Sequence, residues 1–323
     1  MGDILLTTPL VRAIRSRHPD AWITYVTKAA FTPLLDTNPR INEVIGYQQK
    51  SPLADLARQL RASKFTHRLD LHRSLRSRML ALLVPGQWRT YPKHRVARTA
   101  LIQTKRNIYR DHRHVVERYF DAARDLDVHQ DDGPLEFFIR RGAVDNAKRF
   151  LHDQQLGSER ALVAVIPGAA HPTKQWPVRH WQHLVTMLTL NNMDVVVLGG
   201  PAERNLGDEI AAAGAERATN AAGRFDVAGS AALLKHARCA VAGDTGPMHL
   251  ATAIGTPIVA LYGPTVAPFG FFPYRARATV LERDLDCRPC SAFGGPVCPL
   301  KHHHCLTLIT PDEVFDAVRR LPR

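Results

Sequence analysis

Residues 240–253 read Ala-Val-Ala-Gly-Asp-Thr-Gly-Pro-Met-His-Leu-Ala-Thr-Ala, a short apolar run that ends in a glycine-rich turn and continues as a helical pattern. Two earlier stretches have the same design, because 162–166 runs into Pro-Gly and 194–198 runs into Gly-Gly. Short runs dominated by apolar residues are typical of parallel strands that are buried on both faces. A helical pattern follows each run, so this half of the chain predicts a parallel sheet with helices on both sides.

The alternation of strands and helices extends over the whole chain. In the first half the sequence predicts helices at 9–17, 53–60, 74–83 and 115–126, and strands at 22–27, 68–71 and 135–139. A chain of 323 residues, at roughly 100–200 residues per domain, predicts two α/β domains. We place these domains at 1–150 and 151–323, because a helix expected over 143–151 leads out of the first.

The composition is that of a globular protein, with 45% hydrophobic and 23% charged residues. The longest apolar stretches fall short of the roughly 18–20 residues that a membrane-spanning helix needs. The chain opens Met-Gly-Asp-Ile and has no pattern of a signal peptide, so a cytoplasmic location is expected. Five cysteines, an odd number, do not suggest the disulfide framework of a secreted protein.

Positive charge is concentrated in the first half of the chain. The formal net charge is +13, and residues 1–150 hold 27 Lys and Arg against 15 Asp and Glu, whereas residues 151–323 hold 16 against 15. Such a field attracts nucleic acid, an anionic membrane face or a phosphorylated substrate, although it also describes a basic surface kept for solubility. No RRM-type motif and no zinc-finger spacing supports a nucleic-acid partner.

The turn at 243–249 carries the strongest candidate for chemistry. In open parallel sheets, ligands bind beyond the carboxyl ends of the strands. A helix that opens there presents backbone N–H groups and its positive dipole end to a phosphate, while Thr245 adds a hydroxyl. Asp244 and His249 have groups that can hydrogen-bond a sugar or a diphosphate. The alternative is a plain helix start with Thr245 as its N-cap.

Three further turns carry candidate groups. Lys174, in the loop at 167–177, can neutralise a phosphate as a point charge. Glu203 follows the strand at 194–198 and can bind a ribose hydroxyl, or it can serve only as an acid that complements a helix dipole. Turns of this kind after several strands of one domain together indicate a nucleotide. Asp3, near the start of the chain, is a candidate general base or a cap.

At this point the sequence resembles glycosyltransferase family 9, the ADP-heptose:lipopolysaccharide heptosyltransferases. The motifs that carry the resemblance are Gly2-Asp3 followed by Thr7-Thr8-Pro9, Lys174-x-Trp-Pro, Asp244-Thr-Gly-Pro-Met-His-Leu-Ala, Leu69-Asp-Leu-His-Arg-Ser-Leu-Arg-Ser and His114-Val-Val-Glu-Arg-Tyr. They are spread over almost the whole chain. The resemblance implies a GT-B fold, in which two Rossmann-like domains face a central cleft.

The resemblance also implies an activity. We expect an inverting, metal-independent transfer of heptose from ADP-heptose to the inner core of lipopolysaccharide, with no cofactor. The N-terminal domain would bind the acceptor and the C-terminal domain the nucleotide-sugar. Asp3 matches the catalytic base of the family. The positions that match its donor site are Lys174, Glu203, Asp244, Thr245, Gly246 and His249.

The implied acceptor is an anionic glycolipid, since lipid A and the inner core carry phosphates and acidic sugars. We expect Ser74, Arg76 and Arg78 to contact it, with further candidates at Arg89, Lys93, Arg95 and Arg98. Peripheral contact with the cytoplasmic face of the inner membrane follows. Two alternatives stay open. The base-recognition pocket is not legible from sequence, which leaves a different nucleotide-sugar donor. The basic first half also fits a non-catalytic protein that binds polyanions or nucleic acid.

The chain departs from the family at its start. Family members begin with a β-strand before Gly-Asp, but here Met1 stands directly before that motif. We therefore expect the N-terminal domain to lack its first, central strand. A truncated start is the favoured explanation, and loss of the element from the domain is the alternative. Asp3 would then lie on a nearly free terminus, where chains are poorly ordered.

A cysteine cluster lies near the end of the chain. Its pattern is Cys287-x2-Cys290-x7-Cys298-x6-Cys305, with three histidines at 302–304. Four soft ligands can form a tetrahedral structural zinc site, although this is not a standard finger spacing. Free thiols, or disulfides formed on oxidation, are the alternatives.

Overall fold

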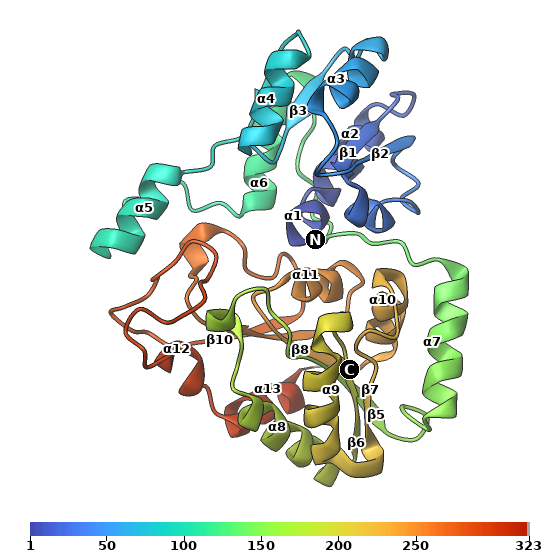
Figure 1. The fold of residues 1–323 in the computed structure, drawn as a ribbon, viewed down its shortest axis with the longest axis vertical. Helices are drawn as coiled ribbons and strands as arrows, with labels where there is room; N and C mark the ends of the chain where they lie inside the picture. The colour runs from blue at the N-terminus through green and yellow to red at the C-terminus, as the bar shows by residue number, and fades with distance from the viewer. Residues whose placement is uncertain (322–323) are drawn as a thin grey trace. The chain divides into compact units, whose positions relative to one another are not determined.

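The structure, a computed structural model, describes residues 1–321 and divides into two compact units (Figure 1). Unit 1 comprises Met1, Asp3–Lys93 and Arg113–Phe138, and unit 2 comprises Gly2, His94–His112 and the chain from Ile139 onward. The main division therefore falls ahead of the boundary expected near residue 150. The reason is that α7 (Arg141–Asp153) packs on α10 (Val227–His236) within unit 2.

Unit 2 is built on one parallel sheet. Its strands are β5 (Ala161–Ile166), β6 (Met193–Val197), β7 (Ala218–Asn220), β8 (Cys239–Gly243), β9 (Ile258–Tyr262) and β10 (Ala278–Glu282). Their order is β10-β9-β8-β5-β6-β7, and every neighbouring pair is parallel. This is the order of a doubly wound Rossmann-like sheet. Nearly every residue of β5, β6, β8 and β9 is buried, as the apolar runs in the sequence predict.

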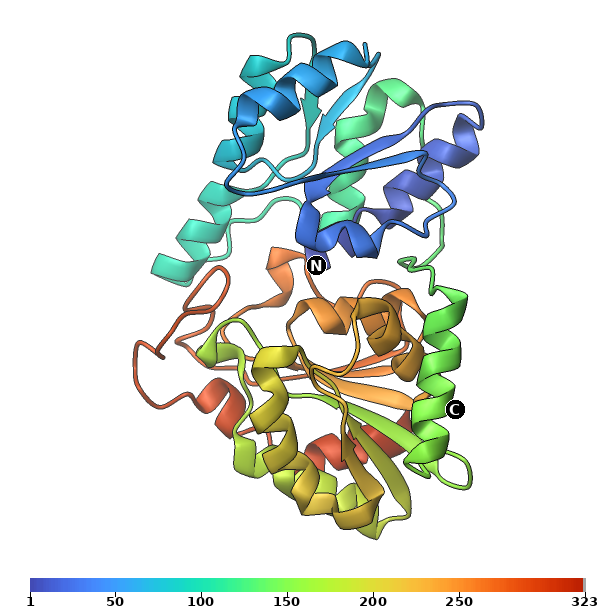
Figure 2. The ribbon, with the colours of Figure 1, turned by 45° about the vertical axis from the view of Figure 1, so that its right-hand side comes forward.

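Helices cover both faces of this sheet (Figures 1 and 2). On one face lie α8 (Val178–Leu190), α9 (Arg204–Ala211) and α13 (Pro311–Arg320), and on the other α10 and α11 (Gly246–Ala253). Trp181, Leu184 and Leu188 recur at helical spacing on α8 and are fully buried against the strands. The remaining helices of the unit are α5 (Arg95–Thr104) and α12 (His304–Thr307).

Unit 1 contains two separate pairs of parallel strands: β1 with β2, and β3 with β4. The bounds are β1 (Thr24–Lys28), β2 (Glu43–Tyr47), β3 (Arg68–Asp70), β4 (Trp88–Thr90), α2 (Thr8–Arg17), α3 (Leu53–Ala62), α4 (Leu75–Leu83) and α6 (Val115–Tyr119). The chain opens with the short helix α1 (Gly2–Leu5). None of the helices within residues 1–321 is both long and apolar enough to span a bilayer.

A cavity of about 930 Å³ lies in unit 1, and its lining includes all of β1 and all of β3. Much of the remaining lining is core, including Leu56, Leu60 and Leu80. No strand among the described residues joins the two pairs into one sheet.

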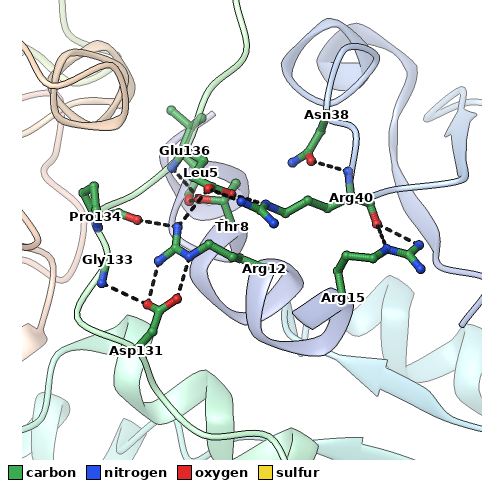
Figure 3. A network of polar contacts seen from close by, with 10 residues as sticks. All are labelled: Leu5, Thr8, Arg12, Arg15, Asn38, Arg40, Asp131, Gly133, Pro134 and Glu136. Atoms are coloured by element: carbon green, nitrogen blue, oxygen red, sulfur yellow. Dashed lines mark hydrogen bonds and ion pairs between the residues drawn. The ribbon is translucent and has the colours of Figure 1, made fainter. Parts of the chain in front are cut away.

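A network of polar contacts surrounds Arg12 and Arg40 in unit 1 (Figure 3). The guanidinium of Arg12 donates two hydrogen bonds to Asp131, at 2.6 and 2.7 Å, and one to the carbonyl of Pro134 at 2.9 Å. Glu136 lies 3.2 Å from Arg12 and accepts two hydrogen bonds from Arg40, at 2.7 and 2.8 Å. These charge-assisted contacts attach helix α2 to the segment that ends the unit.

The strand predicted at 135–139 is wrong. Its alternation is real, since Leu135 and Phe137 are buried, but the segment has no strand partner. Side chains bind its backbone instead: the N–H of Glu136 donates to Thr8 Oγ1 at 2.9 Å, and the carbonyl of Phe138 accepts from Thr37 at 2.5 Å. The segment is therefore extended but lies outside any sheet.

Candidate functional site

The site lies where the strand order of the unit 2 sheet reverses, between β5 and β8. The strands β5 and β8 are neighbours, and the chain leaves β5 toward β6 on one side but leaves β8 toward β9 on the other. The crevice outside the carboxyl ends of two such strands is where doubly wound sheets bind ligands. The loop after β5 carries Lys174 and the turn after β8 carries Asp244.

Lys174 and Asp244 form an ion pair at this point. The ammonium Nζ lies 2.6 Å from Oδ2 of the carboxylate and 3.2 Å from the Asp244 carbonyl oxygen. Both side chains are largely buried. Thr265, in the turn after β9, donates from its hydroxyl to the same Oδ2 at 2.7 Å. The carboxylate therefore positions the lysine, and a third strand end positions the carboxylate.

Helix α11 begins beside this pair without a side-chain cap. Thr245 has an extended backbone, and no side-chain hydrogen bond caps the helix at this residue. Its hydroxyl instead lies 3.4 Å from the Gly243 carbonyl. Of the two interpretations of this motif, a helix simply capped by Thr245 is therefore not realised. A helix start that no side chain caps, followed by Gly246 and the buried His249, is suited to an anion.

Glu203 shapes the neighbouring turn after β6. Its Oε2 accepts a hydrogen bond from the backbone N–H of Gly200 at 2.7 Å. A Cβ added at Gly168 would lie 2.7 Å from Glu203 Cγ, and one added at Gly199 would lie 2.8 Å from Glu203 Cβ. Glycine is therefore required at both turns for this side chain to fit. Whether Glu203 also contacts a ribose stays a prediction.

Arg288 is a supporting residue that the sequence analysis missed. It belongs to the cysteine-containing loop, and its side chain is almost fully buried. Its guanidinium donates to the carbonyls of Gly263 and Thr265, at 2.5 and 2.8 Å. Arg288 therefore holds the turn that presents the Thr265 hydroxyl to Asp244. The residue types of this loop do not indicate the contact, because it depends on how the loop folds.

The same loop also fixes the segment that carries the lysine. The backbone N–H of Gly295 donates to Thr173 Oγ1 at 2.8 Å, and this hydroxyl donates to the Gly295 carbonyl at 3.0 Å. Nε2 of His303 lies 3.0 Å from the Thr173 carbonyl. Since Thr173 directly precedes Lys174, these contacts restrict where the ammonium can lie.

The cysteines of this loop are free thiols. Within residues 1–321 no group of three or more His, Cys, Asp and Glu side chains is placed to hold a metal ion, so the predicted zinc site at Cys287, Cys290, Cys298 and Cys305 gains no support. Burial raises the pKa of Cys305 to about 11 and also raises that of Cys290. Both thiols are therefore protonated and poorly nucleophilic at neutral pH.

In unit 1, Asp3 is an exposed residue of α1 and lines the cavity between the strand pairs. Ser74 and Arg76 line the same cavity, whereas Arg78 does not. Close to Asp3, burial raises the pKa of Tyr25 to about 12, and its hydroxyl lies 2.9 Å from Thr7 Oγ1. Tyr25 is thus a neutral phenol at neutral pH, and the assignment of Asp3 as the base stays a prediction.

The residues expected to contact the acceptor have structural partners. Ser74 is the N-cap of α4 and accepts from the N–H of Ser77 at 3.1 Å. Arg76 donates to the carbonyls of Gln49 and Ser51, at 3.1 and 2.9 Å. A role in acceptor binding would be additional to these contacts and stays a prediction.

The basic run beyond α4 is also partly engaged. Arg89 forms an ion pair with Asp125, and Lys93 donates to the backbone of unit 1. In unit 2, the guanidinium of Arg98 lies over the ring of Phe293, 5.2 Å from its centroid. Much of this positive charge is therefore built into the fold rather than free for a ligand.

Comparison with known proteins identifies the family of this chain. The model of "Glycosyltransferase family 9 (heptosyltransferase)" matches residues 53–298. Lipopolysaccharide heptosyltransferase 2 of Salmonella typhimurium (strain LT2) is 30% identical over 339 residues, which cover 99% of this chain and 95% of that protein. Lipopolysaccharide heptosyltransferase 3 of Escherichia coli (strain K12) is 28% identical and covers 82% of this chain, over 80% of its own length.

Solved structures agree. A family 9 glycosyltransferase from Veillonella parvula DSM 2008 superposes with a TM-score of 0.82 at 25% identity, covering 99% of this chain and 94% of its own. The ADP-heptose lps heptosyltransferase II of E. coli gives 0.76 at 25% identity, with 99% and 95% covered. The GT-B fold expected from the sequence is confirmed. The chain belongs to glycosyltransferase family 9 and is a glycosyltransferase enzyme.

Proposed function

We propose that this enzyme transfers heptose from ADP-heptose to the inner core of lipopolysaccharide, with inversion and without a metal cofactor. The observation that carries the proposal is the buried Lys174–Asp244 pair. It lies at the point where the strand order of the sheet reverses, beside the uncapped start of α11. The names of the relatives, which are lipopolysaccharide heptosyltransferases, support the donor sugar and the acceptor.

Unit 2 would bind the donor. In this proposal Lys174 and the N-terminal end of α11 face the diphosphate, with Thr245 and Gly246 as backbone and hydroxyl donors. Negative charge grows on the diphosphate as its bond to the sugar breaks, and fixed donors in a dry site stabilise that charge without a metal. His249 and Glu203 would contact the sugar or the ribose. The ADP-heptose named for the structural relative from E. coli supports adenine as the base.

Unit 1 would bind the acceptor and supply the base. The carboxylate of Asp3 takes the proton of an acceptor hydroxyl as that oxygen attacks the anomeric carbon of heptose. The new C–O bond forms on the face of the anomeric carbon opposite the bond to ADP. That bond breaks, and ADP leaves with its electron pair. One carboxylate and one leaving-group site are sufficient for such a displacement, so inversion is the expected stereochemistry.

The proposed acceptor is an anionic glycolipid at the cytoplasmic face of the inner membrane. Within unit 1, residues 71–93 contain five Lys and Arg and no Asp or Glu. Phosphates and acidic sugars are the groups that such a surface attracts. Arg76 and Arg78 are the arginines that we assign to this contact.

A transfer assay tests the proposal. Purified enzyme is incubated with ADP-heptose and a lipopolysaccharide of truncated inner core, and both the ADP released and the mass of the acceptor are followed. We expect the acceptor to gain one heptose, and Asp3→Asn to lower kcat by about 10²–10⁴-fold while the affinity for ADP is unchanged.

The exposed Asp55, on α3, supplies the control, and Asp55→Asn should leave transfer at the rate of the native chain. A native rate for Asp3→Asn would remove Asp3 as the base. If ADP-heptose is not consumed with any truncated lipopolysaccharide, the proposed donor and acceptor are wrong.

A further inference from the structure

Helix α4 of unit 1 presents an apolar stripe to solvent. Leu75, Met79 and Leu82 are 77%, 49% and 86% exposed, and Leu83 beside them is exposed as well. Their spacing of four and then three residues puts the first three on one face of the helix. Contiguous exposed apolar side chains on a soluble domain mark an interaction surface rather than a random surface composition.

The opposite face of α4 is already used by the core. Leu80 and, just beyond the helix, Val84 are buried with residues of α3. The start of the helix is fixed to β3, because Ser77 donates to the buried carboxylate of Asp70 at 2.9 Å. The helix is therefore firmly seated in unit 1, and its outward stripe is not a misplaced core face.

Arginines border the stripe on both sides. At about 100° per residue, Arg78 lies on one side of the Leu75–Met79–Leu82 line and Arg76 on the other. Arg78 is exposed, whereas Arg76 is held by carbonyls at 49 and 51 and lies over the ring of Tyr47. The helix contains no acidic residue. Long basic side chains keep their charge in the headgroup layer while apolar neighbours enter the acyl boundary.

The geometry points to α4 as a docking face for an anionic lipid bilayer, in which the stripe enters the interface and the exposed Arg78 meets lipid phosphates. A second copy of the chain is the less suitable occupant. A symmetric contact through the same stripe would bring Arg76 and Arg78 against the same arginines of the other copy, with no acid on the helix to compensate.

This inference rests on the proposed function, because a glycolipid acceptor lies in a membrane, but it assigns a surface that needs no donor to operate. The docked helix would hold unit 1 at the level of the lipid headgroups. The enzyme would then meet its acceptor by diffusion in the plane of the membrane instead of extracting it.

Flotation with vesicles tests the docking. The full-length enzyme is mixed with vesicles of phosphatidylcholine alone or of phosphatidylcholine with phosphatidylglycerol. We expect flotation only with the anionic vesicles. Leu82→Ser should lower the partition coefficient about tenfold, as expected for loss of one inserted leucine. Arg78→Ala should lower it about fivefold, the effect of one basic residue near an anionic surface.

Leu190, which is 81% exposed on α8 of unit 2, supplies the matched control. Leu190→Ser should float like the native chain, and circular dichroism should be the same for every variant because all three positions are exposed. Equal partition of native enzyme and Leu82→Ser overturns the inference. So does a native dimer that Leu82→Ser converts to monomer without any vesicle binding.

Failure of the docking and failure of the proposed function give different results. If native enzyme floats and Leu82→Ser does not, while ADP fails to bind, the docking face stands and the donor assignment falls. If ADP binds but neither protein floats, the donor assignment stands and the docking face falls.

Discussion

The hydroxyl of Thr265 offers a test of how the site is held together. This hydroxyl donates to the buried carboxylate of Asp244 at 2.7 Å, and both residues are buried. Thr265→Val keeps the shape of the side chain and removes only the donor. A hydrogen bond to a charged group contributes about 1.5–3 kcal/mol, so we expect the free energy of unfolding to fall by that amount.

Thr256 supplies a matched comparison. It is buried to the same degree, but its hydroxyl donates to the neutral carbonyl of Leu234 at 2.9 Å. A hydrogen bond between neutral groups contributes about 0.5–1.5 kcal/mol, so Thr256→Val should cost about 1 kcal/mol less than Thr265→Val. The same substitution thus separates the effect of the charged acceptor from the effect of losing a buried hydroxyl.

The two variants should also differ in nucleotide binding. Asp244 positions Lys174, so loosening the carboxylate in Thr265→Val should weaken ADP about tenfold, equivalent to 1.4 kcal/mol, while Thr256→Val should bind as the native enzyme does. Urea unfolding followed by tryptophan fluorescence gives the stabilities, and calorimetry gives the affinities. Equal stabilities for both variants, with unchanged ADP affinity, would refute the supporting role of Thr265.

Three other changes have defined outcomes. Lys174→Met should weaken ADP by about 1.5–3 kcal/mol in calorimetry, whereas loss of the exposed Lys148 in Lys148→Met should have no effect. Arg12→Ala should lower the urea stability of unit 1 by about 3 kcal/mol, the low end for a buried ion pair, because its partner Asp131 is 42% exposed. Burial lowers the pKa of His180 from 6.5 in the folded chain. The unfolded chain therefore binds the proton more readily, and the free energy of unfolding falls as the pH drops below 6.5. In His180→Asn the urea midpoint should depend less on pH in this range.

Much of unit 2 is predictable because its signal is local. The strands β5, β6, β8 and β9 are apolar runs bounded by glycine, and α8 carries its buried residues at helical spacing. The glycine-rich turns follow these strands directly. Once the strands are parallel and adjacent, the residues in their turns must meet at one edge of the sheet.

What the sequence did not predict depends on partners distant in the chain. The edge strands β7 and β10 carry mixed side chains and were not predicted. In the extended segment at 135–139, the backbone hydrogen-bonds to the side chains of Thr8 and Thr37 instead of to a strand. Thr265 lies in the turn directly after β9, where the functional groups of parallel sheets gather, so it could have been proposed. Arg288 could not, because only the folded loop brings its guanidinium to the turn after β9.

We expect the strand ends of unit 2 to bind the ADP part of the donor, and calorimetric titration with ADP, UDP and GDP tests this most directly. ADP should bind more tightly than UDP and GDP, and Lys174→Met should weaken ADP binding by about ten- to a hundredfold. If no nucleotide binds, or if ADP binds the native enzyme and Lys174→Met equally well, the site is wrongly assigned.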